Sequence, residues 1–163
     1  MRPLSTVRPG AVWRHLAVFR ESVRSPADLW LLARMAAWAV WLPVLKYLVP
    51  LPTLVRIAAA APRRASRRLD QERKVISLAR WLYAPLLRPD RGCLQRSLLA
   101  YHFLGEANAD PRFFVGVRKD NGQFLAHAWV AVDGEPRGDS PDWVGGFTAM
   151  LAFGADGHPV TTE

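Results

Sequence analysis

The spacing of hydrophobic residues changes along the chain near residue 92. Before that point, Val75, Ile76, Ala79 and Leu82 fall at helical spacing, which gathers them on one face. Beyond it, the segments PRFFVGVR and QFLAHAWVAV are rich in Val and Phe and are joined through KDNG, a strong hairpin signal. The order of helices followed by antiparallel strands predicts an α+β domain.

Three helices are expected between residues 25 and 91. The first begins with an N-cap and capping-box pair, Ser25 and Asp28, and Pro43 should bend or end it. The segment TLVRIAAAA predicts a short second helix, and Ser66 is expected to cap a third. A fourth helix, CLQRSLLAYHFLG, should end at its glycine.

The hairpin turn sets the register of the first two strands. If Asn121 and Gly122 form a two-residue turn, Gly116 faces His127. A residue without a side chain at that place would leave room beside the imidazole. Gly116 could instead mark a β-bulge.

The next turn allows two registers. A two-residue turn formed by Asp133 and the glycine after it would set Ser140 opposite His127. A loop one residue longer, with a bulge, would set Asp139 there. We favour the longer loop, because it gives the strand histidine a carboxylate partner on the neighbouring strand.

Composition limits the class of protein. A chain of 163 residues, 50% of them hydrophobic, suits one domain with a full core. A single cysteine, Cys93, rules out an internal disulfide and a cysteine-based zinc site, and we expect no metal or cofactor. The lone thiol fits a reducing compartment, and residues 1–24 lack the apolar segment of a secretory signal. We therefore expect a cytoplasmic protein.

Charge divides the chain in two. Residues 1–91 carry 17 basic and 5 acidic side chains, whereas residues 92–163 carry 5 and 9. Together with the helical pattern, this predicts a basic N-terminal segment (1–24), a helical region (25–91) and a C-terminal core (92–163). The basic half is suited to an acidic peptide, an anionic membrane surface or nucleic acid, unless it is only a solvated face.

Two of these partners can be weighed from local sequence. The cluster of Arg63, Arg64, Arg67 and Arg68 lacks the interleaved aromatic residues of a nucleic-acid site, so no nucleic-acid partner is expected. The apolar stretch over residues 35–55 is interrupted by prolines and by a central lysine. We interpret it as buried helices, with peripheral contact to a membrane surface as the alternative.

Cys93, His127 and Asp139 occur in the order of a thiol-based acyl-transfer site. A thiol at a helix N-terminus is stabilised as the thiolate. An imidazole can take its proton and return it to a leaving amine, while a carboxylate fixes the imidazole tautomer. Each residue also has a structural interpretation, as a buried cysteine, a strand histidine or a turn aspartate. An enzyme and a binding module with an inert cysteine both stay open.

The segments around these residues resemble a known family. The Cys-Leu-x-Arg-Ser-Leu helix start, the Gly-Val-x strand, the His-Ala-Trp-Val strand and the Asp-Gly turn followed by an acid are similar to those of lasso-peptide B2 proteins. These are leader peptidases in the transglutaminase-like branch of the papain-like cysteine proteases. The resemblance covers residues 88–155 and implies that Cys93 is the nucleophile, His127 the base and Asp139 the orienting acid.

Five further residues have candidate roles near this site. Asp133 and Asp142 are rivals for the role of the acid. Arg96, one helical turn past the cysteine, could steady the thiolate, bind a substrate carboxylate or form an internal salt bridge. Ser97 shares the cysteine's helix face and either contacts substrate or allows close packing. Trp129 shares the histidine's strand face and either shields the imidazole or fills the core.

The resemblance also implies a fold and a pathway. It implies an N-terminal helical region packed on a small transglutaminase-like core of one central helix and an antiparallel sheet. Such enzymes cut a ribosomally made lasso-peptide precursor after its leader, and a separate macrolactam synthetase then closes the ring. A separate leader-recognition protein (B1-type) presents the precursor. Another thiol acyltransferase or amidase, or a non-catalytic peptide-binding module, remains the alternative.

Overall fold

The structure is a computed structural model that describes residues 25–59, 66–83 and 92–162. In the described chain, the helices α2 (Pro26–Leu48), α3 (Leu51–Ala59), α4 (Leu69–Tyr83) and α5 (Cys93–Glu106) precede the sheet. They are followed by β1 (Arg112–Asp120), β2 (Gln123–Val132), β3 (Glu135–Arg137), α6 (Pro141–Val144), β4 (Thr148–Phe153) and β5 (Pro159–Val160). This order confirms the α+β class. The expected basic segment 1–24 lies outside the described residues, as do Arg63 and Arg64.

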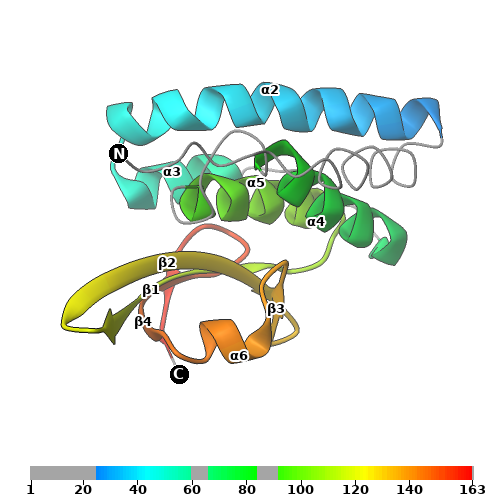
Figure 1. The fold of residues 1–163 in the computed structure, drawn as a ribbon. Helices are drawn as coiled ribbons and strands as arrows, with labels where there is room; N and C mark the ends of the chain where they lie inside the picture. Colours follow the sequence, from blue (N-terminus) through cyan, green and yellow to red (C-terminus); the bar gives the residue numbers. More distant parts are fainter. Residues whose placement is uncertain (1–24, 60–65, 84–91, 163) are drawn as a thin grey trace, which may run out of the picture.

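The molecule is layered around α5. Figure 1 shows α2 outermost, α3, α4 and α5 beneath it, the sheet beyond these helices, and α6 on the far side of the sheet. Helix α5 contacts α2, α3 and α4 as well as β1 and β2. Its buried side chains include Leu98, Leu99, Phe103 and Leu104. Burial of each such side chain contributes about 1.5–3 kcal/mol, so this packing holds α5 against the sheet.

Helix α2 begins where the sequence predicts. The backbone N–H of Ser25 donates to Asp28 Oδ2 at 3.0 Å, and the N–H of Asp28 donates to Ser25 Oγ at 3.2 Å. The capping box is therefore complete.

Three expected helix ends are wrong. Pro43 does not end α2, which continues for five more residues and packs through the fully buried Leu42; of its two expected effects, a bend stays a prediction. Ser66 does not cap α4, because the carbonyl of Arg68 accepts the first backbone bond of that helix. Gly105 lies within the last turn of α5, which ends one residue later.

The five strands form one antiparallel sheet in the order β3-β2-β1-β4-β5. The β1–β2 register confirms the prediction, with Gly116 opposite His127. Asn121 and Gly122 both have positive φ, 48° and 81°, as a tight hairpin turn requires. On the β4 side the register shifts between Val115 and Gly116, so this glycine also marks an irregularity.

The predicted β2–β3 register is wrong. Val132 pairs with Glu135, so the turn has two residues, Asp133 and Gly134, rather than three. Both have positive φ, 57° and 79°, which gives the turn whose twist matches that of the strands. Pairing ends at Arg137, and no β3 residue lies opposite the histidine.

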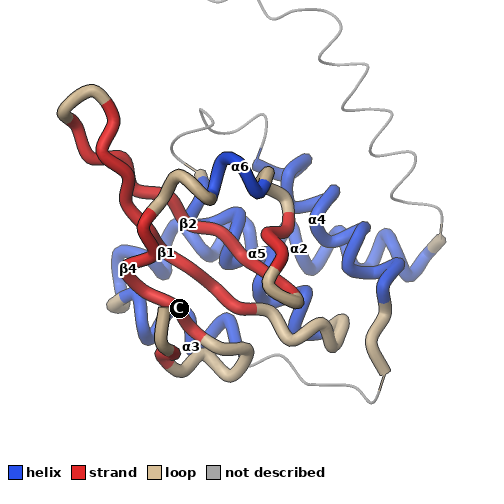
Figure 2. The backbone as a smooth tube through the Cα atoms, turned by 90° about the horizontal axis from the view of Figure 1, so that it is seen from below, coloured by secondary structure: helices blue, strands red, loops and turns tan. Residues whose placement is uncertain are grey.

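A second apolar cluster covers the sheet face opposite α5. Trp129, Val144 and Phe147 form it, with Phe114 and Ala149 packed against them. Figure 2, seen from below, shows α6 close to β3. The segment from Pro141 to Phe147 thereby forms one side of the region around His127.

Candidate active site

Cys93 is the first residue of α5 and the only cysteine of the chain. The first backbone bond of this helix runs from the N–H of Arg96 to the carbonyl of Gly92, at 2.9 Å. The N–H groups of Cys93 and Leu94 therefore have no partner inside the helix. Together with the helix dipole, they favour a negative charge at this end.

The surroundings of Cys93 favour its thiolate. Burial raises the pKa of the thiol, but interactions with the His127 imidazole and with the backbone of Ala128 and Leu94 lower it by more. The net pKa of Cys93 lies below its ordinary value. A lowered thiol pKa is what a nucleophilic cysteine needs near neutral pH.

His127 lies between the thiol and a carboxylate. Its Nε2 is 3.4 Å from Asp139 Oδ2, within ion-pair distance, although the geometry gives this buried atom no hydrogen bond among the described residues. The imidazole also interacts with the Cys93 thiol. Burial lowers the pKa of His127, but Asp139 and Cys93 raise it by more, to about 9. A lowered thiol pKa beside a raised imidazole pKa favours the thiolate–imidazolium form of the pair.

Asp139 reaches His127 from outside the sheet. After β3, Gly138 adopts a φ of +86°, a left-handed conformation that suits glycine, and the chain turns. Arg96 Nη2 lies 2.7 Å from Asp139 Oδ1 and 3.0 Å from Oδ2. Burial raises the pKa of Asp139, but His127 and Arg96 lower it by more, so the carboxylate stays ionised.

The two rival carboxylates lie elsewhere. Asp133, in the β2–β3 turn, is exposed and binds Arg67 at 2.7 Å. Asp142 is exposed in the first turn of α6. Of the three aspartates, only Asp139 is placed at the imidazole.

The three residues expected to contact substrate all make contacts within the protein. The Arg96 guanidinium is bound to Asp139, and the buried Ser97 hydroxyl donates to the Ala128 carbonyl at 2.8 Å. Trp129 fills the second apolar cluster, and its ring occupies the space above Gly116 that was expected to lie open beside the imidazole. The structure therefore shows structural contacts for Arg96, Ser97 and Trp129, and a contact of any of them with substrate stays a prediction.

An aromatic wall beside the imidazole was not predicted. The ring centroids of Phe147 and Trp143 lie 5.2 and 6.2 Å from that of His127. The Arg118 guanidinium lies over both rings, at 4.4 Å from the centroid of Trp143 and 4.7 Å from that of Phe147. Only the Ser-Pro start of α6 offered a sequence signal, since Ser140 caps that helix.

The three side chains of the site have complementary chemical properties. The thiolate is a nucleophile, the imidazolium a proton donor, and the carboxylate holds the ring. The N–H of Cys93, which has no partner inside the helix, can donate to an oxyanion. Within residues 25–59, 66–83 and 92–162, no group of three or more His, Cys, Asp or Glu side chains is arranged to hold a metal ion.

A thiol at the start of a helix, with an imidazole on an adjoining strand and a carboxylate behind it, defines the arrangement of papain-like thiol enzymes. The sequence agrees, because the family model of the transglutaminase-like superfamily matches residues 31–152. The chain belongs to the transglutaminase-like superfamily, and the match includes most of the helical region as well as the site. Comparison with curated proteins and with solved structures gives no match.

Proposed function

We propose that the protein is a cysteine protease that removes the leader peptide from a ribosomally synthesised lasso-peptide precursor. The observation that carries the proposal is the placement of Cys93, His127 and Asp139 in one chain of contacts. The resemblance of the segments around them to leader peptidases supplies the substrate class. The catalytic roles follow from the chemistry of each side chain.

In the first half-reaction, the Cys93 sulfur attacks the carbonyl carbon of the last leader residue. The resulting oxyanion accepts a hydrogen bond from the N–H of Cys93. The His127 imidazolium then donates its proton to the leaving nitrogen. The peptide C–N bond breaks, a thioester joins the leader to Cys93, and the core peptide leaves with a free N-terminal amine.

In the second half-reaction, water hydrolyses the thioester. The now neutral imidazole of His127 takes a proton from water as the oxygen attacks the carbonyl carbon. The C–S bond breaks, the leader leaves as a carboxylic acid, and the thiolate–imidazolium pair is restored. Asp139 stays ionised throughout and stabilises the imidazolium.

The proposal places three partners around this chain. A precursor with its leader is the substrate, a separate leader-recognition protein of the B1 type presents it, and a separate macrolactam synthetase uses the released amine. Cleavage would take place in the cytoplasm, where a reducing environment keeps Cys93 as a free thiol.

The test is cleavage of a synthetic lasso precursor in the presence of its recognition protein, read by mass spectrometry. Wild type should release the leader as an acid, while Cys93→Ala should leave the precursor intact and keep the wild-type melting temperature. A variant that still cuts would remove Cys93 from the mechanism. A leader joined to an added amine would identify an acyltransferase, since water and amines attack the same thioester. If wild type and Cys93→Ala both bind the precursor and neither cleaves it, the protein is a peptide-binding module.

A further inference from the structure

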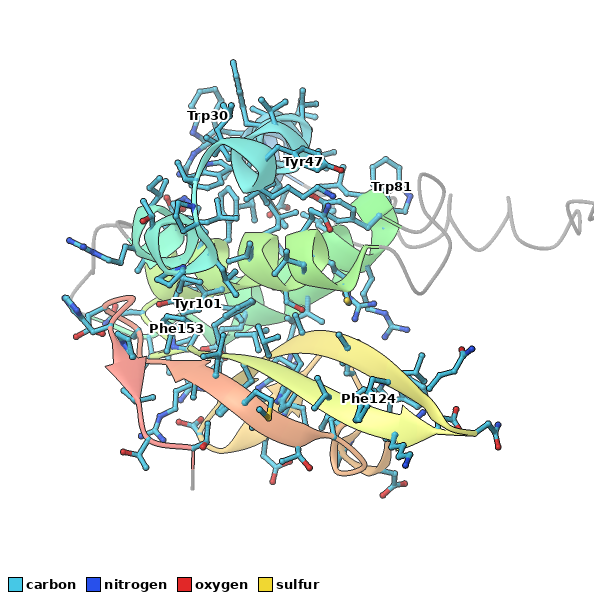
Figure 3. All side chains as sticks on the ribbon, turned by 90° about the vertical axis from the view of Figure 1, so that its left-hand side faces the viewer. Trp30, Tyr47, Trp81, Tyr101, Phe124 and Phe153 are labelled. Atoms are coloured by element: carbon cyan, nitrogen blue, oxygen red, sulfur yellow. The ribbon has the colours of Figure 1, made fainter. Side chains whose placement is uncertain are left out.

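The outer face of α2 is an apolar surface that the described chain leaves uncovered. The exposed large side chains of this face include Trp30, Val40, Trp41, Val44, Tyr47 and Leu48. At 3.6 residues per turn they fall within an arc of about 120° and extend over about 27 Å. Figure 3 shows Trp30 and Tyr47 on this helix, at the end of the molecule remote from the sheet.

This outer face contains no acidic side chain. Asp28, the only acid of α2, is buried and binds Lys74 at 2.6 Å. Arg34 borders the face and binds Glu106. Lys46 lies over the ring of Tyr47, with its Nζ 4.7 Å from the ring centroid. Helix α2 thus has basic side chains beside its apolar and aromatic groups and no exposed acidic side chain.

The opposite face of α2 belongs to the core of the protein. Among the described residues, α2 is the one helix long and apolar enough to cross a membrane, with a mean hydropathy of 1.3. However, Leu31, Met35 and Leu42 are buried against the rest of the molecule, and the ion pairs of Asp28 and Arg34 tie the helix to its neighbours. A spanning orientation would break these contacts, whereas contact through the outer face alone preserves them.

We propose that the outer face of α2 docks on the surface of an anionic lipid bilayer. Tryptophan and tyrosine are enriched at the membrane interface, and a surface-bound helix combines an apolar face with nearby basic charge. The chain carries a net charge of +8, and residues 1–91 hold 17 basic against 5 acidic side chains, which favours an anionic over a neutral surface. Two copies of the chain, each with a net charge of +8, would instead repel each other across this face.

The layered fold permits docking while the enzyme works. Because α2 lies at the opposite side of the molecule from the sheet and α6 (Figure 1), a bilayer on the outer face of α2 leaves the region around His127 in water. The proposal does not depend on the identity of the substrate, and failure of the cleavage assay would leave it standing.

The test is flotation of the full chain with vesicles of phosphatidylglycerol and phosphatidylcholine, and with vesicles of phosphatidylcholine alone. Wild type should float with the anionic vesicles and much less with the neutral ones. Trp41→Glu, which puts a charge on a side chain 62% exposed, should lower the partition coefficient about tenfold or more. Its melting temperature should not change, because Trp41 is outside the core.

Phe124→Glu is the matched control, since Phe124 is an aromatic residue 75% exposed on the β1–β2 hairpin, away from α2. It makes the same change of charge and should keep the partition coefficient within about twofold. Equal losses in the two variants, or no flotation of wild type, would overturn the proposal. So would a dimer in sedimentation velocity that Trp41→Glu dissociates, because the face would then belong to a second copy.

Discussion

Arg96, one turn into α5, binds both carboxylate oxygens of Asp139, with its Nη2 2.7 and 3.0 Å away from them. Because Cys93 begins the same helix, this ion pair fixes the distance between the acid and the nucleophile across two separate segments. It also keeps the carboxylate charged in a partly buried place. In the proposed mechanism Arg96 is therefore a positioning residue, which acts on the thiol through Asp139 and His127.

Replacement of the guanidinium tests this role. Arg96→Gln should lower kcat/KM by about 10- to 100-fold, since small displacements of catalytic groups have effects of this size. The pKa of Asp139, which Arg96 helps to hold down, should rise. As the pH is lowered, the variant should therefore lose activity at a higher pH than wild type does. Activity against pH is the measurement.

Two further variants make this result specific. Arg96→Lys keeps the charge without the planar fork and should give an intermediate rate. Arg80→Gln, at an exposed position on α4, should behave as wild type. If Arg96→Gln loses activity at the same acidic pH as wild type, the residue only stabilises the fold.

The choice among three aspartates can be tested separately. Asp139→Asn keeps the shape of the side chain but removes the charge that raises the pKa of His127. Cleavage should fall by about 10²-fold or more, as for loss of a general acid–base component. Asp133→Asn and Asp142→Asn should retain the wild-type rate, and a large loss in either of them would reassign the role.

Local signals predicted the parts of the fold that depend on neighbouring residues. The capping box of Ser25 and Asp28 and the hairpin turn at Asn121 and Gly122 are found as expected. Both rest on hydrogen bonds between residues within four positions of each other, which local sequence specifies. The placement of Cys93 at a helix start follows from the same kind of signal.

Tertiary contacts decided the parts that the sequence did not predict. Asp139 lies at His127 although the expected register is wrong, because Gly138 turns the chain after β3 ends. A strand pattern cannot show such a turn out of the sheet. The pairing of Arg96 with Asp139 depends on the packing of α5 against this segment, 43 residues later in the chain. The sequence alone does not decide between this salt bridge and a role at the thiolate or at a substrate carboxylate.

The ionisation of the site predicts two different pH profiles. The pKa of Cys93 is lowered and that of His127 is raised to about 9. Alkylation by iodoacetamide needs only the thiolate, so it should already be fast at pH 7 and stay fast at higher pH. Cleavage also needs the imidazolium, so it should fall as the pH rises through about 9.

His127→Gln separates the two contributions. Without the imidazole the pKa of Cys93 should rise, because His127 is the largest cause that lowers it. Alkylation at pH 7 should become slower, while cleavage should be lost at every pH. A wild-type thiol that reacts only near the ordinary cysteine pKa of about 8.5 would contradict a thiolate–imidazolium pair.

Gly116 links the stability of the sheet to the surroundings of the imidazole. A Cβ atom at this position would lie 2.7 Å from the carbonyl oxygen of Thr148 and 2.9 Å from the ring of Trp129. Gly116→Ala should therefore lower the free energy of unfolding by about 1–3 kcal/mol, the usual cost of overpacking. Urea denaturation measures this change.

The double variant identifies the source of the strain. Trp129→Phe alone should destabilise the protein, because a smaller ring leaves a void. The double variant Gly116→Ala with Trp129→Phe should lose less free energy of unfolding than the two single variants lose together, since the smaller ring leaves space for the new methyl group. The contact with Thr148 remains, so recovery should be partial. Strictly additive losses would place the whole strain at the strand backbone rather than at the ring beside His127.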